Sequence, residues 1–250
     1  MNSMGIGIGD PDHNGLLDMA ISNIDGNVLA HNNGDGTFTD LGHWANVDRP
    51  MAAGGRYAVT WGLDFADFNL DGWEDLYLAA GNFQRSPDTP VGVQPNELYV
   101  NDGAGRFLDV SAATGAADPG ESKGVALADY NRDGRMDVFV VNQGGQPRLY
   151  ENVTPLGSNH WLEVDTVGTA SNRDGCGARL VARLADGGQL TREVLCGSTS
   201  VASGSQRTVH FGLGSAATVE HLDVVWPSGM HQTLDHVAAD RVVTIQEPHS

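Results

Sequence analysis

The chain has 250 residues, 33 of them glycine, and a formal net charge of −18 with only one lysine, Lys123. This length allows one or two domains with a sizeable core. The acidity argues against nucleic acid and anionic membranes as partners, because both need a basic surface, and no apolar run reaches the roughly 18 residues of a membrane span.

Three short acidic loops recur along the first part of the chain, each between two apolar segments. They begin at Asp10, Asp67 and Asp129, which lie 57 and 62 residues apart. The flanking segments are short and rich in β-formers, which predicts buried strands. Three copies in register indicate a repeat architecture rather than isolated turns.

The loops place oxygen-bearing residues at alternate positions 1, 3 and 5, glycine at position 6 and aspartate at position 9. Calcium takes about six to eight oxygen ligands, so such a loop can curl around one ion, with a backbone carbonyl at position 7 completing the set. The glycine permits the positive φ of a tight bend. The predicted ligands are Asp10, Asp12, Asn14, Leu16 and Asp18; Asp67, Asn69, Asp71, Trp73 and Asp75; and Asp129, Asn131, Asp133, Arg135 and Asp137.

These loops are not EF-hands. An EF-hand needs glutamate at position 12, where this chain has Ile21, Leu78 and Val140. Three bound Ca²⁺ ions would add six positive charges and bring the formal charge from −18 to −12, so metal binding accounts for part of the acidity.

Each repeat also contains a glycine-led segment before its loop and a glycine-rich turn after it. Residues 29–40 match residues 98–109, which predicts two strands joined by a hairpin, and the third copy ends after 149–152. Four short strands per unit of about sixty residues are typical of propeller blades. The middle unit carries an insertion near Phe83–Pro95, which is either a binding loop or a tolerated surface insertion.

The last third of the chain predicts a second, smaller β domain. Strand patterns at 179–184 and 189–195 flank a turn at 186–188, and 219–226 returns through 231–234, which favours a small antiparallel sandwich. Cys176 and Cys196 lie on the two arms of the first hairpin, so they form either a disulfide or two buried thiols.

The repeats resemble the FG-GAP/VCBS repeats of integrin-type β-propellers, whose D-x-[DN]-x-[DN]-G-x-x-D loops bind calcium. The tail resembles the ASPIC/UnbV domain that follows such repeats in the cartilage acidic protein group and its bacterial relatives. The residues that carry this second resemblance lie at 159–162, 171–175, 177–179, 192–194, 210–214 and 226–229.

The predicted fold is therefore all-β: a partial β-propeller of about two and a half blades in residues 1–153, followed by an antiparallel β-sandwich in 154–250. The resemblance implies about seven blades, so we expect an N-terminally truncated chain, which also explains the absence of a signal peptide. Open propeller edges would favour self-association.

The leading functional hypothesis is a secreted, extracellular or periplasmic interaction or adhesion module that binds up to three Ca²⁺ ions and is not catalytic, with an unknown protein or glycan partner. The alternative is a carbohydrate-binding protein or hydrolytic enzyme with a pocket on the propeller face or between the domains. No catalytic set is identified. Residues 212–217 match a dinucleotide fingerprint, but no helix follows, so a nucleotide site is not expected.

Overall fold

The computed structural model describes residues 3–24, 26–48, 59–82, 94–197, 200 and 202–249. Almost the whole insertion predicted at Phe83–Pro95 lies outside these residues, so its role stays open. The described chain is built from strands, and its two helices, α1 (Gly42–Ala45) and α2 (Ser111–Thr114), have four residues each. Neither is long enough to span a membrane.

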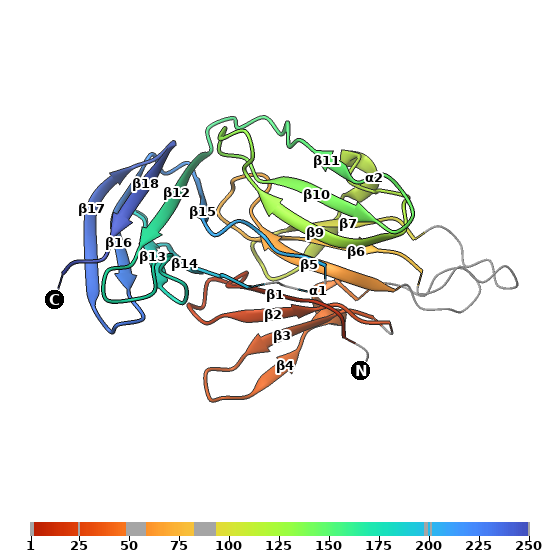
Figure 1. Cartoon of the computed structure of the whole chain (residues 1–250), viewed down its shortest axis with the longest axis horizontal. Helices are drawn as coiled ribbons and strands as arrows, with labels where there is room; N and C mark the ends of the chain where they lie inside the picture. Colours follow the sequence, from red (N-terminus) through yellow and green to blue (C-terminus); the bar gives the residue numbers. More distant parts are fainter. Residues whose placement is uncertain are drawn as a thin grey trace, which may run out of the picture.

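The first part of the chain forms three antiparallel sheets, stacked from β4 to β11 in Figure 1. Blade 1 consists of β1 (Ile6–Gly9), β2 (Asp18–Ile21), β3 (Val28–Asn32) and β4 (Phe38–Asp40). Blade 2 consists of β5 (Thr60–Ala66), β6 (Asp75–Ala80), β7 (Glu97–Asn101) and β8 (Phe107–Asp109). Blade 3 consists of β9 (Ser122–Ala128), β10 (Asp137–Asn142) and β11 (Arg148–Tyr150).

This arrangement confirms the predicted unit of strand, acidic loop, strand, strand, glycine turn and strand. The predicted count of about two and a half blades is slightly low, because two sheets have four strands and the third has three. Consecutive blades pack through apolar side chains: Leu29 of blade 1 and Val47, which follows α1, belong to one cluster with Leu63 and Leu76 of blade 2. A second cluster joins blade 2 to blade 3.

The second part of the chain forms a β-sandwich. One sheet has the order β15 (Val209–Gly214), β12 (His160–Val167), β18 (Arg241–Gln246). The other has the order β14 (Gln189–Glu193), β13 (Arg179–Arg183), β16 (Thr218–Val225), β17 (His231–Ala238).

The core of this sandwich lies between the two sheets and includes the buried Trp226 and Phe211. The predicted hairpin at 179–195 is confirmed as β13 and β14. The prediction of a purely antiparallel domain is wrong in one respect, since β12 and β18 run parallel. The last strand returns to the sheet that the first strand began, and this long-range pairing has no local sequence signal.

A disulfide bond joins Cys176 to Cys196, with their Cα atoms 5.5 Å apart. This resolves the alternative that the sequence left open. It ties the segment before β13 to the segment after β14, and Cys196 lines one cavity with Gly5 and Ile6 of blade 1.

The connection from β14 to β15 runs along the inner strands of the blades. The Gly204 N–H donates to the Val125 carbonyl at 3.3 Å, and the Gln206 N–H donates to the Leu127 carbonyl at 2.9 Å. Ser200 forms an isolated bridge with Gly5 of blade 1. The second domain therefore contributes backbone to the inner face of the repeats, as the light-blue trace beside β9 in Figure 1 shows.

This close approach explains why the inner strands β5 and β9 have glycine at their third residue. A Cβ atom on Gly62 would lie 2.0 Å from the Ser203 hydroxyl oxygen, and one on Gly124 would lie 2.0 Å from the Ala202 carbonyl oxygen. At Gly124 the clash is with the backbone, so no side chain fits there while the connection is in place, whereas at Gly62 the Ser203 side chain would have to move. The predicted boundary at 153/154 falls between the sheets of the two parts, but residues 200–206, which follow it, contact the blades that precede it.

Candidate metal loops at a domain interface

The three acidic loops connect the first and second strands of their blades. Loop 1 covers residues 10–18, loop 2 covers 67–75 and loop 3 covers 129–137. The position-6 glycines Gly15, Gly72 and Gly134 have φ of 79°, 99° and 88°, which confirms the predicted bend. Position 4 is also left-handed in each loop, with φ between 57° and 60° at His13, Leu70 and Arg132, and sequence reasoning missed this.

In loop 2 the polar side chains turn inward and are held by backbone N–H groups. Asp67 accepts the Gly72 N–H at 2.7 Å, and Asp71 accepts the Trp73 N–H at 2.9 Å. Asn69 accepts the Asp71 N–H at 3.0 Å and donates to the Asp71 carboxylate at 2.9 Å. Hydrogen bonds thus link the side chains at positions 1, 3 and 5 to the backbone of the loop, and those at positions 3 and 5 to each other.

Loop 3 repeats this geometry almost bond for bond. Asp129 accepts the Gly134 N–H at 2.7 Å, and Asp133 accepts the Arg135 N–H at 3.0 Å. One difference is electrostatic: the Arg135 guanidinium also contacts the Asp133 carboxylate. A positive side chain beside the cradle competes with a bound cation, so loop 3 is expected to bind more weakly than loop 2.

The position-9 aspartates anchor the loops to the next strands. Asp75 accepts the Asn101 N–H at 2.9 Å, Asp137 accepts the Asn152 N–H at 2.7 Å and Asp18 accepts the Asn32 N–H at 2.7 Å. All three aspartates are buried. Position 9 therefore joins each loop to the following strand. Among the described residues no loop has its three aspartates with oxygens all within 4.8 Å of one another, so the full ligand sets, including the position-7 carbonyls of Leu16, Trp73 and Arg135, remain predictions.

The buried carboxylates of loop 2 are costly to ionise without a cation. Burial raises the pKa of Asp67 to about 7, and the neighbouring Asp71 adds to the rise. Burial and the Asp67 carboxylate raise the pKa of Asp75 well above its ordinary value. A hard divalent cation prefers such all-oxygen sets and would offset the repulsion between the carboxylates, so the residues present fit Ca²⁺.

Two asparagines that the sequence did not flag as functional tie the loops to the neighbouring blades. The Asn101 side-chain amide donates to the Pro11 carbonyl of loop 1 at 2.8 Å, and the Asn152 amide donates to the Phe68 carbonyl of loop 2 at 2.8 Å. Their recurrence at one position of the repeat was the available signal. Loops 1 and 2 are therefore each held by their own blade and by the next.

The second domain packs directly on all three loops. The Arg179 guanidinium contacts the Gly15 carbonyl of loop 1, and the Asn159 amide donates to the Asn69 carbonyl of loop 2 at 3.0 Å. His210 lies 2.9 Å from the Gly134 carbonyl of loop 3. Burial lowers the pKa of His210 to about 4, so the imidazole is neutral at pH 7.

The apparent dinucleotide fingerprint belongs to this interface. A Cβ atom on Gly212 would lie 1.9 Å from the Asp67 carboxylate oxygen, and the Gly214 N–H donates to the Leu70 carbonyl at 3.0 Å. The two glycines let strand β15 approach the backbone of loop 2. The prediction that they do not begin a nucleotide-binding helix agrees with this geometry, since β16 follows.

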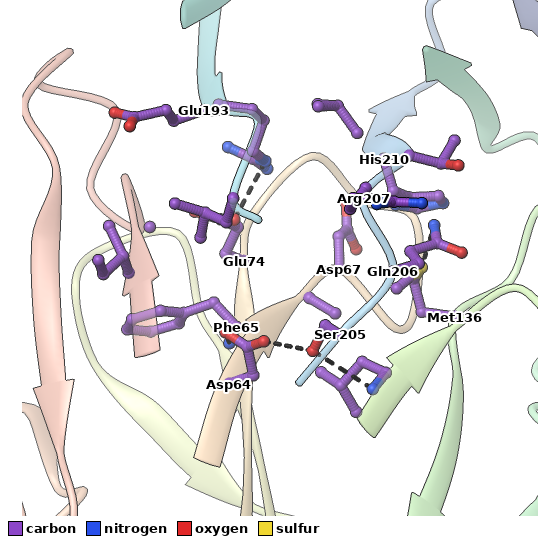
Figure 2. A pocket seen from close by; sticks show the side chains of 18 of the residues that line it. Asp64, Phe65, Asp67, Glu74, Met136, Glu193, Ser205, Gln206, Arg207 and His210 are labelled. Carbon is purple, nitrogen blue, oxygen red and sulfur yellow. Dashed lines mark hydrogen bonds and ion pairs between the residues drawn. The ribbon is translucent and has the colours of Figure 1, made fainter. Parts of the chain in front are cut away.

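A cavity of about 90 Å³ lies between blade 2 and the second domain. Figure 2 shows Asp64 and Glu74 on one side, Asp67, Gln206 and His210 on the other, and Ser205 between them. Burial raises the pKa of Asp64 to about 7, although the Ser205 hydroxyl that donates to its carboxylate opposes the rise.

A buried ion pair crosses the same interface. Arg192 of β14 lies 3.0 Å from the Glu74 carboxylate, and both side chains are at least nine-tenths buried. Breaking one partner of such a pair leaves an uncompensated buried charge. The cavity is smaller than the roughly 300–1,000 Å³ of typical small-molecule sites, so its residues act mainly as the polar part of the domain interface.

Fold and site together define a propeller-type repeat protein whose acidic loops support a β-sandwich domain. Residues 10–78 and 67–140 match the FG-GAP-like repeat family, and residues 168–250 match the ASPIC and UnbV family. The repeat matches together span 10–140, more than half of the chain. The chain therefore belongs to the FG-GAP-like repeat proteins and carries an ASPIC/UnbV domain.

The chain is also similar to cartilage acidic protein 1. The proteins of Mus musculus and Homo sapiens are each 41% identical to it over 71 residues, which cover 28% of this chain and 11% of the relative. The protein of Xenopus tropicalis is 38% identical over 73 residues, which cover 29% of this chain and 11% of the relative. The chain thus matches about a tenth of the length of these relatives.

Proposed function

We propose that the protein is a calcium-binding, non-catalytic interaction module in which the metal loops also hold the second domain in place. The observation that carries this proposal is that all three loops contact the second domain, through Arg179, Asn159, Gly212 and His210. An ion that orders the loops would therefore order the domain interface as well.

The family and the cartilage acidic protein relatives indicate an extracellular propeller-type module. Millimolar calcium, which extracellular sites of modest affinity use, suits loops of this kind. Secretion to the periplasm or outside the cell, adhesion, and an unknown protein or glycan partner complete the proposal. The outer faces of blades 1 and 3 expose apolar side chains, among them Ile6, Phe139, Val141 and Leu149, which supports self-association as a further proposal.

Native mass spectrometry of the whole chain tests the metal part of the proposal. We expect up to three Ca²⁺ ions per chain in millimolar calcium acetate and none after EDTA treatment. Magnesium at the same concentration is the control, because it demands near-octahedral geometry and retains water. A chain that binds no Ca²⁺ under these conditions contradicts the proposal.

Carbohydrate binding is the second candidate, and one pocket favours it. A cavity of about 360 Å³ between blades 1 and 2 is lined by Trp44, Trp73, Asp12, Asp18 and His31. This volume lies within the usual range of small-molecule sites. Indole rings offer apolar faces to a sugar ring, and carboxylates accept its hydroxyl groups.

A glycan array compares the two candidates at this pocket. Glycan binding that is lost in Trp44→Ala supports the carbohydrate-binding function, because Trp44 is half exposed and its replacement leaves the blade cores intact. If the native chain retains no glycan in calcium, this contradicts the carbohydrate-binding function, and the protein-interaction function remains.

A further inference from the structure

Loop 1 differs from loops 2 and 3 at two positions that lie close together. Its position 2 is proline, Pro11, where the other loops have Phe68 and Tyr130. The residue before the recurring asparagine of its third strand is His31, whereas the same position holds Val100 in blade 2 and Glu151 in blade 3.

The proline changes what the position-9 aspartate can accept. In loop 2 the Phe68 N–H donates to Asp75 Oδ2 at 2.9 Å, and in loop 3 the Tyr130 N–H donates to Asp137 Oδ2 at 3.2 Å. Pro11 has no N–H to donate. The equivalent oxygen in loop 1, Asp18 Oδ2, is therefore not used by position 2.

The imidazole of His31 faces this oxygen. His31 Nδ1 lies 3.5 Å from Asp18 Oδ2 and 3.1 Å from Asp12 Oδ2. The Asp18 side chain is 3% exposed, so its second oxygen points into the loop rather than to solvent. Within the part of the chain that the structure describes, this trio is the group of histidine and acidic side chains whose ligand atoms lie within 4.8 Å of one another.

Nitrogen and oxygen donors together select a different class of ion from oxygen alone. Imidazole suits zinc, cobalt, nickel and copper, whereas carboxylate and carbonyl oxygens suit calcium and magnesium. Loop 2 has only an aliphatic side chain at the position of His31. Loop 3 has another oxygen donor there, since Glu151 Oε1 lies 3.5 Å from the Asn131 amide of the loop.

We propose that His31 is a metal ligand of loop 1, together with Asp12 and Asp18, and that it makes this loop accept first-row transition ions such as Zn²⁺ and Co²⁺, while loops 2 and 3 remain calcium loops. This inference rests on the proposed function in taking the loops as cation cradles. The sequence differences that support it, Pro11 and His31, lie outside the motif shared by the three loops.

Cobalt provides the test, because its visible absorption changes with the ligands and geometry around the ion, so a spectrum that differs between the native chain and a His31 variant places the ion at His31. The whole chain is titrated with CoCl₂ by isothermal calorimetry and absorption, in calcium-free buffer and again in saturating calcium. We expect one Co²⁺ per chain that calcium displaces poorly. His31→Val, which gives loop 1 the residue of blade 2, should weaken Co²⁺ binding by at least the roughly 10- to 100-fold that loss of a supporting residue costs a metal site.

Two further variants test whether a loss of Co²⁺ binding is specific to the His31 imidazole. His43→Val removes a histidine whose side chain is 97% exposed, and it should bind Co²⁺ as the native chain does. His31→Gln keeps a polar side chain in case the valine variant does not fold, and it should bind Ca²⁺ but lose tight Co²⁺ binding.

The outcomes separate this inference from the proposed function. Native-like Co²⁺ affinity and absorption in both folded His31 variants overturn the inference and leave the calcium loops untouched. Failure of the native chain to bind Ca²⁺, with Co²⁺ binding that still depends on His31, overturns the proposed function and retains a transition-metal site at loop 1.

Discussion

Replacing Asp71 by asparagine in loop 2 separates the contribution of bound calcium from that of the hydrogen bonds within the loop. The Asp71 side chain is exposed, and its Oδ1 accepts the Trp73 N–H at 2.9 Å. The asparagine carbonyl accepts the same bond. The bond that is lost, from the Asn69 amide to Asp71 Oδ2, is exposed to water, so the metal-free fold should change little. The lost negative charge weakens the attraction for a hard cation.

The size of the effect follows from linkage. Calcium at 100 times its Kd stabilises the folded state by about 2.7 kcal/mol per site. In proteins of 150–250 residues each kcal/mol shifts the Tm by about 2–4 °C, so loss of the loop 2 ion should lower the Tm by about 5–10 °C in calcium. In EDTA the variant should melt within about 2 °C of the native chain, as surface substitutions usually do.

Differential scanning calorimetry in calcium and in EDTA measures both numbers. Asp102→Asn is the matched control, because Asp102 is an exposed aspartate of a hairpin turn whose Oδ1 accepts the Ala104 N–H at 2.8 Å. The Tm of Asp102→Asn should differ from that of the native chain by the same small amount in both buffers. Equal loss of Tm for Asp71→Asn in calcium and EDTA, or a native chain that melts identically in both, would refute the assignment of loop 2 as a calcium site.

Two further predictions concern the second domain. Gly212→Ala places a Cβ atom 1.9 Å from the Asp67 carboxylate, so we expect the free energy of unfolding to fall by the roughly 1–3 kcal/mol typical of overpacking, and calcium to bind loop 2 more weakly. Gly197→Ala is the control, because a Cβ atom there meets nothing within 4 Å. Equal stability of the two variants in calorimetry would contradict the packing of β15 on loop 2. Glu247 is buried, which opposes its ionisation, but hydrogen bonds from Ser228 and from the Ser171 and Thr169 backbone outweigh burial and lower its pKa to about 2. Since the ordinary pKa of this carboxyl is 4.5, the ionised Glu247 side chain stabilises the fold above about pH 4.5, and this contribution is lost as the pH falls toward 2. The unfolding free energies of the native and Glu247→Gln chains, measured in urea, should therefore converge at low pH. A difference that stays constant with pH would disprove this.

The repeat region was largely predictable because its chemistry is local. The alternation of oxygen donors and the position-6 glycine lie within nine residues, and the apolar strands flank them directly. The same holds for the hairpin of β13 and β14, which a short turn closes. Residues such as Asn101 and Asn152 recur visibly, but their bonds to the carbonyls of a neighbouring blade require the blades to be stacked.

The second domain shows where such reasoning ends. Gly212 and Gly214 match a dinucleotide-binding fingerprint that does not apply here. The sequence alone indicated no structural role for the glycines at the third residue of β5 and β9. Both sets are explained by close approach of segments far apart in the sequence: β15 against loop 2, and the β14–β15 connection against β5 and β9. The parallel pairing of β12 with β18 is of the same kind.

The sequence alone therefore determined the all-β class, the repeat and the residues of the three acidic loops, since these depend on spacing along a few neighbouring residues. Only the tertiary structure showed that the second domain packs on the loops and that His31 lies beside Asp12 and Asp18 of loop 1. Such contacts join residues from 13 positions apart, as for His31 and Asp18, to 164 positions apart, as for Arg179 and Gly15, and their energies depend on packing that no local pattern encodes.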